Sequence, residues 1–341
     1  MSNPESNRER GGALLTVLWL SAALAAIALS VSTTVRAEIE HTSTVADGLR
    51  AHYLATGSLE RGLQWMMWGA GPRTPDGQAR FWERIKPRMK MSYATGDVVV
   101  EMIPENAKLN VNTTPEAELL KVLNSLTGDP AQARAVVDGI LDWRTTSQAT
   151  ASFENYYLAL GPTFRPPHAS LQEIEELLFV RGVTPELFYG NYIADAQGQL
   201  FARGGLRDCF SVWGTRGAVD INGASPAVLE AIGLTAAQAT AVVGRRTEKP
   251  FENLLELQEM GIPATRLRIG GGSMWTMRAV ARLRRPDKQL SETVRSASAV
   301  VKYWDDPRGH SSVVQVLRYY GDAWSEFEVA PPLVPTGALA R

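Results

Sequence analysis

Two pairs of acidic side chains have spacings that could support acid–base chemistry. Asp138 and Asp142 are four residues apart and Glu173 and Glu176 are three apart, so each pair would share one face of a helix. Two carboxylates held together can divide the roles of general acid and general base. Apolar residues occupy the other side of both segments, which is typical of a solvent-exposed helix face. We therefore interpret both pairs as solvated surface.

Thiol and imidazole groups are too scattered to indicate a nucleophile or a metal site. Cys209 is the single cysteine, and no His or Lys flanks it to lower its pKa, so we predict a buried free thiol. The histidines have no spacing typical of zinc ligands. They are His41, His52, His168 and His310.

Motifs of common enzymes are also missing from the sequence. The glycine run 270–272 lacks the Lys-Ser/Thr that a phosphate-binding loop requires. There is no Gly-x-Ser-x-Gly elbow. The sequence therefore predicts no catalytic residues, and we interpret the chain as an assembly component rather than an enzyme.

The composition is that of a globular protein with an uneven charge distribution. The 341 residues are 45% hydrophobic and 21% charged, with a formal net charge of −1. These values exclude a disordered or collagen-like chain, and the length predicts roughly two domains. Residues 97–186 contain 13 acidic and 6 basic residues, a local charge of −7.

The N-terminal region contains a long uncharged stretch. From Ala13 to Val35 there are 23 residues without a charge, which as a helix would reach roughly 35 Å and cross a hydrocarbon core of about 30 Å. A cleaved secretory signal is the alternative, but its apolar region is usually only about 7–15 residues long. Arg8 and Arg10 before the span, with Arg36 after it, favour a cytoplasmic N-terminus.

We expect this helix to continue to Trp68, because no proline interrupts it after Ala13. Apolar or small residues continue beyond the span at alternating intervals of three and four. We predict that this stripe packs the second half of the helix onto a soluble domain. Its members are Val35, Ile39, Thr42, Ala46, Leu49, Tyr53, Thr56, Leu63 and Met67.

Two glycines separate the short charged leader from the apolar helix, in the order Arg10-Gly11-Gly12-Ala13-Leu14. This motif resembles the processing site of type IV prepilins. In that family a membrane peptidase cuts after the glycine and methylates the new N-terminus. The resemblance implies cleavage after Gly11 and a methylated Gly12, with cleavage after Gly12 as the open alternative.

The fifth residue of the mature chain would be Thr16, or Val17 after the alternative cut. Most pilins and pseudopilins have glutamate there, where its carboxylate is thought to meet the free amine of a neighbouring subunit. A subunit at the end of a filament has no neighbour above it to supply that amine. The missing glutamate therefore resembles the K-type minor pseudopilins of type II secretion systems.

The rest of the chain mixes strands and helices. Residues 97–103, Met274–Leu283, Val294–Trp304 and Ser312–Tyr320 have the β-branched or alternating character of strands. Thr113 or Thr114 is a plausible N-cap for a helix that begins with Pro115. A second helix is expected to end near Trp143.

Two related modules are separated by about 110 residues. Lys108–Glu116 and Val219–Pro226 share an apolar-x-apolar-Asn pattern followed by a cap and a proline. Both resemble helix-hairpin-helix modules, which commonly bind DNA phosphate. The local negative charge favours a scaffolding role instead, and we interpret the best basic cluster as the solvated face of a strand. That cluster comprises Arg266, Arg268, Arg278, Arg282, Arg284 and Arg285.

The segment between the modules contains a predicted amphipathic helix with Ile174, Leu177, Leu178 and Val180 inward. Asp142-Trp143, Tyr156–Leu158 and Glu176–Gly182 closely resemble the linking region of K-type minor pseudopilins. With the N-terminal motif, the resemblance extends from Arg10 to about Leu257. Members of that family can bind calcium, usually with further acids after Asp-Trp. Here Arg144–Ser147 follow, so no calcium ligands and no other cofactor are assigned.

The resemblance implies an α+β fold with a pilin-like long N-terminal helix, an antiparallel sheet and a large α-helical insertion domain. We expect a prepilin leader at 1–11, a transmembrane and amphipathic helix at 12–70 and a sheet domain formed by 71–114 and 268–330. The insertion would occupy 115–267, with both helix-hairpin-helix-like modules, and a tail would follow at 331–341.

The same resemblance implies a minor pseudopilin that caps the tip of the type II secretion pseudopilus and supports protein export across the outer membrane. Expected partners are I-type and J-type minor pseudopilins, the major pseudopilin, the inner-membrane assembly platform and the prepilin peptidase, with no nucleic acid. The chain would cross the inner membrane once, with the N-terminus cytoplasmic and the C-terminal domain periplasmic. The alternative function is a membrane-anchored, competence-like DNA receptor.

Overall fold

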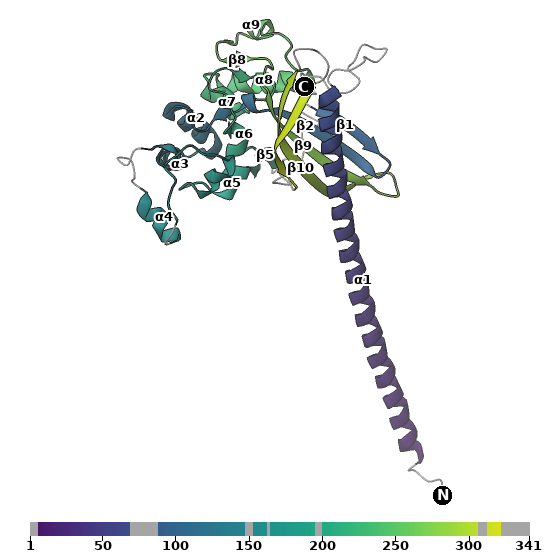
Figure 1. Ribbon diagram of the computed structural model, residues 1–341. Coiled ribbons are helices and arrows are strands. Elements are labelled where there is room, and N and C mark those ends of the chain that lie inside the picture. Colours follow the sequence, from purple (N-terminus) through teal and green to yellow (C-terminus); the bar gives the residue numbers. More distant parts are fainter. Residues whose placement is uncertain are drawn as a thin grey trace, which may run out of the picture. The chain divides into compact units, whose positions relative to one another are not determined.

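The computed structural model describes residues 6–68, 88–146, 153–161, 164–194, 200–305 and 312–321. The chain divides into two compact units, Met1–Arg50 and Ala51–Arg341, and each is described by itself. Helix α1 spans Ser6–Trp68, which confirms the predicted long N-terminal helix (Figure 1). The predicted tail at 331–341 and the first five residues of the predicted leader lie outside the described residues.

A five-stranded antiparallel sheet forms the first part of the larger unit. Its strands lie in the order β1 (Arg88–Tyr93), β2 (Gly96–Pro104), β9 (Met274–Arg284), β10 (Leu290–Asp305) and β11 (Ser312–Tyr320). Four of these strands were predicted from alternating or β-branched residues, and these predictions are confirmed. The antiparallel sheet, the long helix and the helical insertion together confirm the expected α+β fold class.

One face of the sheet packs against the last part of α1. Alternate side chains of the strands, such as Val100 on β2 and Met277 on β9, form a hydrophobic core with Leu59 and Met66 of the helix. Close approach depends on small side chains in the helix, because a Cβ atom at Gly62 would lie 2.8 Å from the Met277 methyl carbon. Burial of these apolar groups is what holds the helix on the sheet.

The buried stripe of α1 is not the predicted one. Within Ala51–Trp68, the predicted Tyr53 and Met67 are 66% and 49% exposed, and of the predicted residues there only Leu63 is buried. The buried face consists instead of Ala51, Ala55, Ser58, Leu59, Leu63 and Met66. The prediction was wrong because this part of the helix has apolar residues on two faces. The face that packs on the sheet combines small side chains, such as Ala55, with larger ones, such as Leu59 and Met66.

In the sequence, the helical insertion lies between β2 and β9; its helices lie beside the sheet in Figure 1. The insertion has its own hydrophobic core. Residues as distant in sequence as Leu119, Ile140, Phe210 and Phe251 meet in that core. The elements of the insertion are η1 (Glu105–Ala107), β3 (Leu109–Asn110), α2 (Glu116–Thr127), α3 (Pro130–Arg144), α4 (Glu154–Leu160), η3 (Ile174–Phe179), α5 (Pro185–Tyr189), β4 (Asn191–Ala194), β5 (Leu200–Arg203), α6 (Leu206–Cys209), β6 (Phe210–Ser211), β7 (Val219–Asp220), α7 (Pro226–Ala231), α8 (Ala236–Glu248), α9 (Leu255–Glu259) and β8 (Leu267–Arg268). Three two-stranded pairings occur, parallel for β3–β6 and β7–β8 and antiparallel for β4–β5.

The two related modules share a hydrogen-bond framework. Asn112 donates to the carbonyl oxygen of Leu171 and accepts from its N–H, at 2.9 and 2.8 Å. Asn222 makes the same two bonds to the backbone of Phe251, at 2.9 and 2.8 Å. An asparagine amide can bind a backbone this way because it offers a donor and an acceptor side by side. The repeat seen in the sequence is therefore also a repeat of contacts.

Two further positions repeat in the same way. Arg144 donates to the carbonyl oxygen of Val111 at 2.5 Å, and Arg246 donates to that of Ile221 at 2.7 Å. Burial lowers the pKa of Arg144, and burial lowers the pKa of Arg246 to about 10. In each module a carboxylate, that of Glu176 or Glu256, also accepts the backbone N–H groups three and four residues before it.

Two local predictions need correction. Neither Thr113 nor Thr114 caps α2, because Pro115 occupies the N-cap position and the helix begins at Glu116. The Thr114 hydroxyl donates instead to the Asn110 carbonyl oxygen at 2.6 Å. In the second module, by contrast, Ser225 caps α7 as its type suggests. The predicted amphipathic helix around Leu177 is a 3₁₀ helix, η3. Leu177 is buried there as expected.

Cys209 is a buried free thiol, as predicted. Its side chain is 1% exposed and its sulfur lies 3.3 Å from the Ser225 hydroxyl. Burial raises the pKa of the Cys209 thiol to about 12, so the reactive thiolate is scarce at neutral pH.

Candidate functional site: an exposed apolar helix and a groove beside it

The N-terminal unit exposes an unusually apolar helix surface. The large apolar side chains from Leu14 to Val35 are 51–71% exposed. The part of α1 that begins at Gly12 is long and apolar enough to cross a membrane, with a mean hydropathy of 2.3 over its best window and none of that window buried. Length and composition therefore fit a single-pass membrane anchor.

The residues of the predicted processing motif lie inside α1. The helix begins at Ser6, five residues before Gly11, because the intervening Arg and Glu residues favour helix. Gly12 is exposed, and a Cβ atom there would have no neighbour within 4 Å. The hydroxyl of Thr16 donates to the Ala13 carbonyl oxygen at 2.8 Å, so this side chain is satisfied within its own helix.

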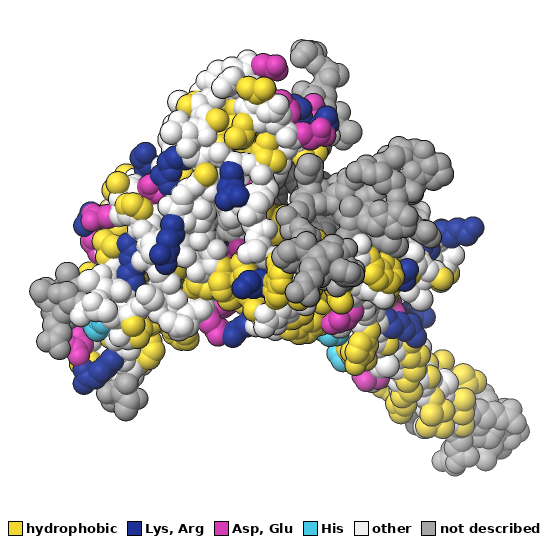
Figure 2. Space-filling view, turned by 45° about the horizontal axis from the view of Figure 1, so that its top comes forward, with side chains coloured by type: hydrophobic (Ala, Val, Ile, Leu, Met, Phe, Trp, Pro, Cys, Tyr) yellow, Lys and Arg dark blue, Asp and Glu magenta, His cyan; other side chains and the backbone are white. Residues whose placement is uncertain are grey.

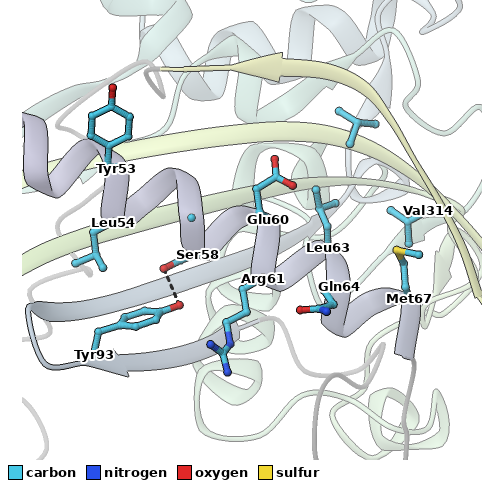
Figure 3. A pocket seen from close by; sticks show the side chains of 12 residues that line it. Tyr53, Leu54, Ser58, Glu60, Arg61, Leu63, Gln64, Met67, Tyr93 and Val314 are labelled. Atoms are coloured by element: carbon cyan, nitrogen blue, oxygen red, sulfur yellow. Dashed lines mark hydrogen bonds between the residues drawn. The ribbon is translucent and has the colours of Figure 1, made fainter.

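In the larger unit, the outer surface of α1 borders a groove of about 640 Å³ (Figure 3). Figure 3 shows Ser58 and Arg61 of the helix on the side toward Tyr93 of β1, with Met67 near Val314 of β11. The described residues that line the groove are Tyr53, Leu54, Gly57, Ser58, Glu60, Arg61, Leu63, Gln64, Met67, Tyr93, Val314 and Val316.

The chemistry of this groove is that of a binding surface. Ser58 donates a hydrogen bond to the Tyr93 hydroxyl at 3.1 Å, and the Arg61 guanidinium lies 5.7 Å from the Trp65 ring centre. Apolar side chains with large exposed fractions adjoin these polar groups, including Met67 at 49% and Val316 at 44%. Large exposed apolar side chains beside a hollow commonly mark a protein contact.

The acidic pairs singled out in the sequence do not form catalytic dyads. Asp138 pairs with Arg134 at 2.7 Å, and Glu176 accepts from the Trp143 indole nitrogen at 3.3 Å. Asp142 is only 2% exposed. The interpretation as solvated surface was thus wrong for Asp142 and for Glu176, which serve the interior of the first module.

The hairpins of the two modules are poorly suited to DNA phosphate. The N-terminus of α3 is capped by the carboxylate of Asp129, which accepts from the Ala131 N–H at 2.8 Å. At α8, Thr235 and Gln238 cap one another's backbone N–H groups. Negative charge or an internal acceptor thus takes the place where a phosphate would bind.

Three arginines of the basic cluster form ion pairs with acidic side chains. Arg266 pairs with Glu118 at 2.5 Å and Arg284 pairs with Asp97 at 2.5 Å. Arg278 forms a further ion pair with a glutamate, Glu101 of β2. On the face that Figure 2 shows, Lys and Arg side chains are scattered among acidic ones, and no broad basic patch forms.

Calcium ligands are not found among the described residues. No three His, Cys, Asp or Glu side chains gather there in a way that could hold a metal ion. After Asp142, where family members often continue with acids, the cation of Arg144 binds the backbone of Val111 and Thr114. No carboxylate cluster among the described residues is therefore assigned to calcium.

The chain thus combines a long helix with an apolar first half, an antiparallel sheet packed on the C-terminal part of that helix and an exposed groove beside it. Residues 100–189 match the family model described as type II secretion system (T2SS), protein K. This match confirms, for that part of the chain, the resemblance to the K-type minor pseudopilins of type II secretion systems.

A solved structure is also similar to the chain, that of the GspK-GspI-GspJ complex from the type 2 secretion system of enterotoxigenic Escherichia coli. The two chains are 15% identical, with a TM-score of 0.47, and the alignment covers 85% of this chain and 99% of the other. A likeness this distant assigns no role to any residue. No curated protein matches the chain.

Proposed function

We propose that this chain is a K-type minor pseudopilin that caps the tip of the type II secretion pseudopilus and so supports protein export across the outer membrane. The match of residues 100–189 to the protein K family is the observation on which the proposal rests. The proposed partners are I-type and J-type minor pseudopilins, the major pseudopilin, the inner-membrane assembly platform and the prepilin peptidase. We propose that these partners bind to the described surface and do not react on it.

The N-terminal unit supports this position in a filament. Thr16 has no carboxylate to offer to the amine of a subunit above, and its hydroxyl is already bonded to the Ala13 carbonyl oxygen. We infer that α1 anchors the chain in the inner membrane, with a cytoplasmic N-terminus and a periplasmic C-terminal domain. The DNA-receptor alternative has the doubled hairpins in its favour, but the ion-paired arginines and the Asp129 cap argue against it.

Processing is the first test. In cells with a prepilin peptidase, the wild-type chain should lose its first eleven residues, and Gly11→Val should block cleavage, because a side chain at the cut site obstructs the peptidase. The intact mass of the purified protein measures this. Gly12→Val is the matched control and should still be cut after Gly11. A wild-type chain that keeps Met1, or one that begins at Glu38, would contradict the proposal.

The groove beside α1 gives a second test, on partner binding. Met67→Asp together with Val316→Asp places two charges on exposed apolar positions of the groove without touching the buried core. We expect capture of I-type and J-type minor pseudopilins by the full-length protein to fall about tenfold or more, as for loss of interface hot spots. Ser92→Asp, at an exposed position of β1, is the control and should leave capture unchanged. Equal capture by both variants would exclude the groove as the contact.

A further inference from the structure

The helical insertion and the sheet have separate hydrophobic cores. Among the described residues, the core of the insertion and the core between α1 and the sheet share no member. Burial of apolar surface is the main force that makes two packed layers one rigid body. The two parts therefore do not share one continuous core, and their docking depends on the contacts at the boundary between them.

A small cavity lined by both charged and apolar side chains lies at the boundary between the two parts; its apolar members include Ile103 and Val300 of the sheet and Phe210 of the insertion. The cavity has a volume of about 40 Å³ and lies between the insertion and the face of the sheet opposite α1. Lys108, Arg207 and Asp208 of the insertion line it, together with Arg278 and Ser298 of the sheet. The cavity shows that packing between the two parts is incomplete at this point, unlike packing inside a close-packed core.

Two chain crossings connect the insertion to the sheet, before Leu109 and after Arg268. The Asn106 amide donates to the Gly270 carbonyl oxygen at 3.1 Å and so ties one crossing to the other. The Gly270 N–H in turn donates to Asp220 at 3.0 Å. Gly270 and Gly271 have φ values of 60° and 76°, which other residues rarely adopt. Both crossings therefore lie at one end of the insertion, as the two links of a hinge do.

Strand β11 contacts the insertion far from these links in sequence. The Arg318 guanidinium of β11 forms an ion pair with the Glu173 carboxylate, just before η3. Tyr320 lies beside Glu175 of η3, and burial and this carboxylate raise the pKa of the Tyr320 phenol. Within the described residues β11 is an edge strand that pairs with β10 alone.

We propose that β11 is a strap that fixes the orientation of the insertion on the sheet, and that loss of its contacts to Glu173 and Glu175 lets the insertion pivot about the two links. Strand β11 is the last described strand of the sheet in chain order. The orientation of the insertion is therefore fixed only after β11 has paired with β10. Val314 and Val316 on the same strand line the groove beside α1, so the strap adjoins the proposed partner surface. The inference does not depend on the proposed function.

Distance measurement on the full-length protein in detergent tests the strap. Spin labels are placed at Ser92→Cys on β1 and Gln132→Cys on α3, both exposed positions, while the buried Cys209 stays unlabelled. The wild-type distance distribution should be narrow. In Arg318→Glu it should broaden about twofold or shift, as expected when a hinged part is released. Adding Glu173→Arg to Arg318→Glu reverses both charges and should restore the narrow distribution.

Controls separate a released insertion from an unfolded one. Arg134→Glu breaks two ion pairs inside the insertion, to Glu116 and Asp138, and should leave the distance distribution unchanged. Arg318→Gln removes the positive charge without adding a negative one. It should broaden the distance distribution less than Arg318→Glu does and leave the circular dichroism spectrum unchanged. A distribution that stays narrow in both Arg318 variants overturns the strap. Partner capture is a separate measurement. Loss of the proposed function would appear as absent capture with unchanged distances, whereas failure of the strap proposal would appear in the distances alone.

Discussion

Replacement of Leu59 by aspartate is expected to unfold the sheet and the part of α1 that packs on it. Leu59 is fully buried in the core between α1 and the sheet. The change removes a buried leucine, worth about 2–5 kcal/mol, and adds a carboxylate without a partner in an apolar site. A domain with an ordinary free energy of unfolding, about 5–15 kcal/mol, would lose most of that free energy. Thermal melting followed by circular dichroism of the full-length protein measures the loss.

Tyr53→Asp is the matched control for this change. Tyr53 lies on the same helix within the same unit but is 66% exposed. We expect its free energy of unfolding to change by only about 0.5 kcal/mol. A larger loss for Tyr53→Asp than for Leu59→Asp would mean that the predicted stripe, rather than the observed one, faces the sheet. The comparison therefore distinguishes directly between the two faces of α1.

The second large effect is expected at the repeated asparagines of the insertion. Asn222→Ala removes both bonds to Phe251 and leaves a buried backbone donor and acceptor without partners. Each unpaired group costs about 1–3 kcal/mol, so a loss of about 2–6 kcal/mol follows. Asn112→Ala should cost a similar amount, because its amide binds Leu171 in the same way. Urea unfolding curves measure both changes.

Two variants make the asparagine prediction specific. Asn222→Asp keeps the acceptor for the Phe251 N–H but loses the donor, so its loss should be intermediate. Asn253→Ala removes one exposed bond, to the Leu255 N–H, and should cost about 1 kcal/mol or less. An Asn222→Ala variant no less stable than Asn253→Ala would show that the shared framework contributes little to the fold.

Much of the fold could be predicted because its local patterns are strong. Alternation over ten residues indicates a strand whatever lies beside it, and Met274–Leu283 became β9 almost residue for residue. The paired modules were visible because asparagine, cap and proline recur at matching positions. Their hydrogen bonds to Leu171 and Phe251 were not visible, because nothing in the sequence pairs an asparagine with a backbone 59 or 29 residues away.

The candidate site was predicted only in outline. An exposed apolar helix and the processing motif were both expected from residues 10–35, where the signals are continuous along the chain. The groove beside α1 was missed, since it needs Tyr93 and Val316 brought to one helix from strands more than 200 residues apart. Burial of Asp142 was missed for a similar reason, because an acidic residue within an amphipathic segment is usually exposed.

The sequence by itself determined that this protein has one long N-terminal helix, an apolar first half to that helix, alternating strands and two copies of one module. Each of these is encoded in the spacing of neighbouring residues. Only the tertiary structure decided which face of α1 meets the sheet, whether Thr114 caps a helix and which strand holds the insertion. Those outcomes depend on matching surfaces, such as Gly62 of α1 against Met277 of β9, and shape matching is a property of two segments together.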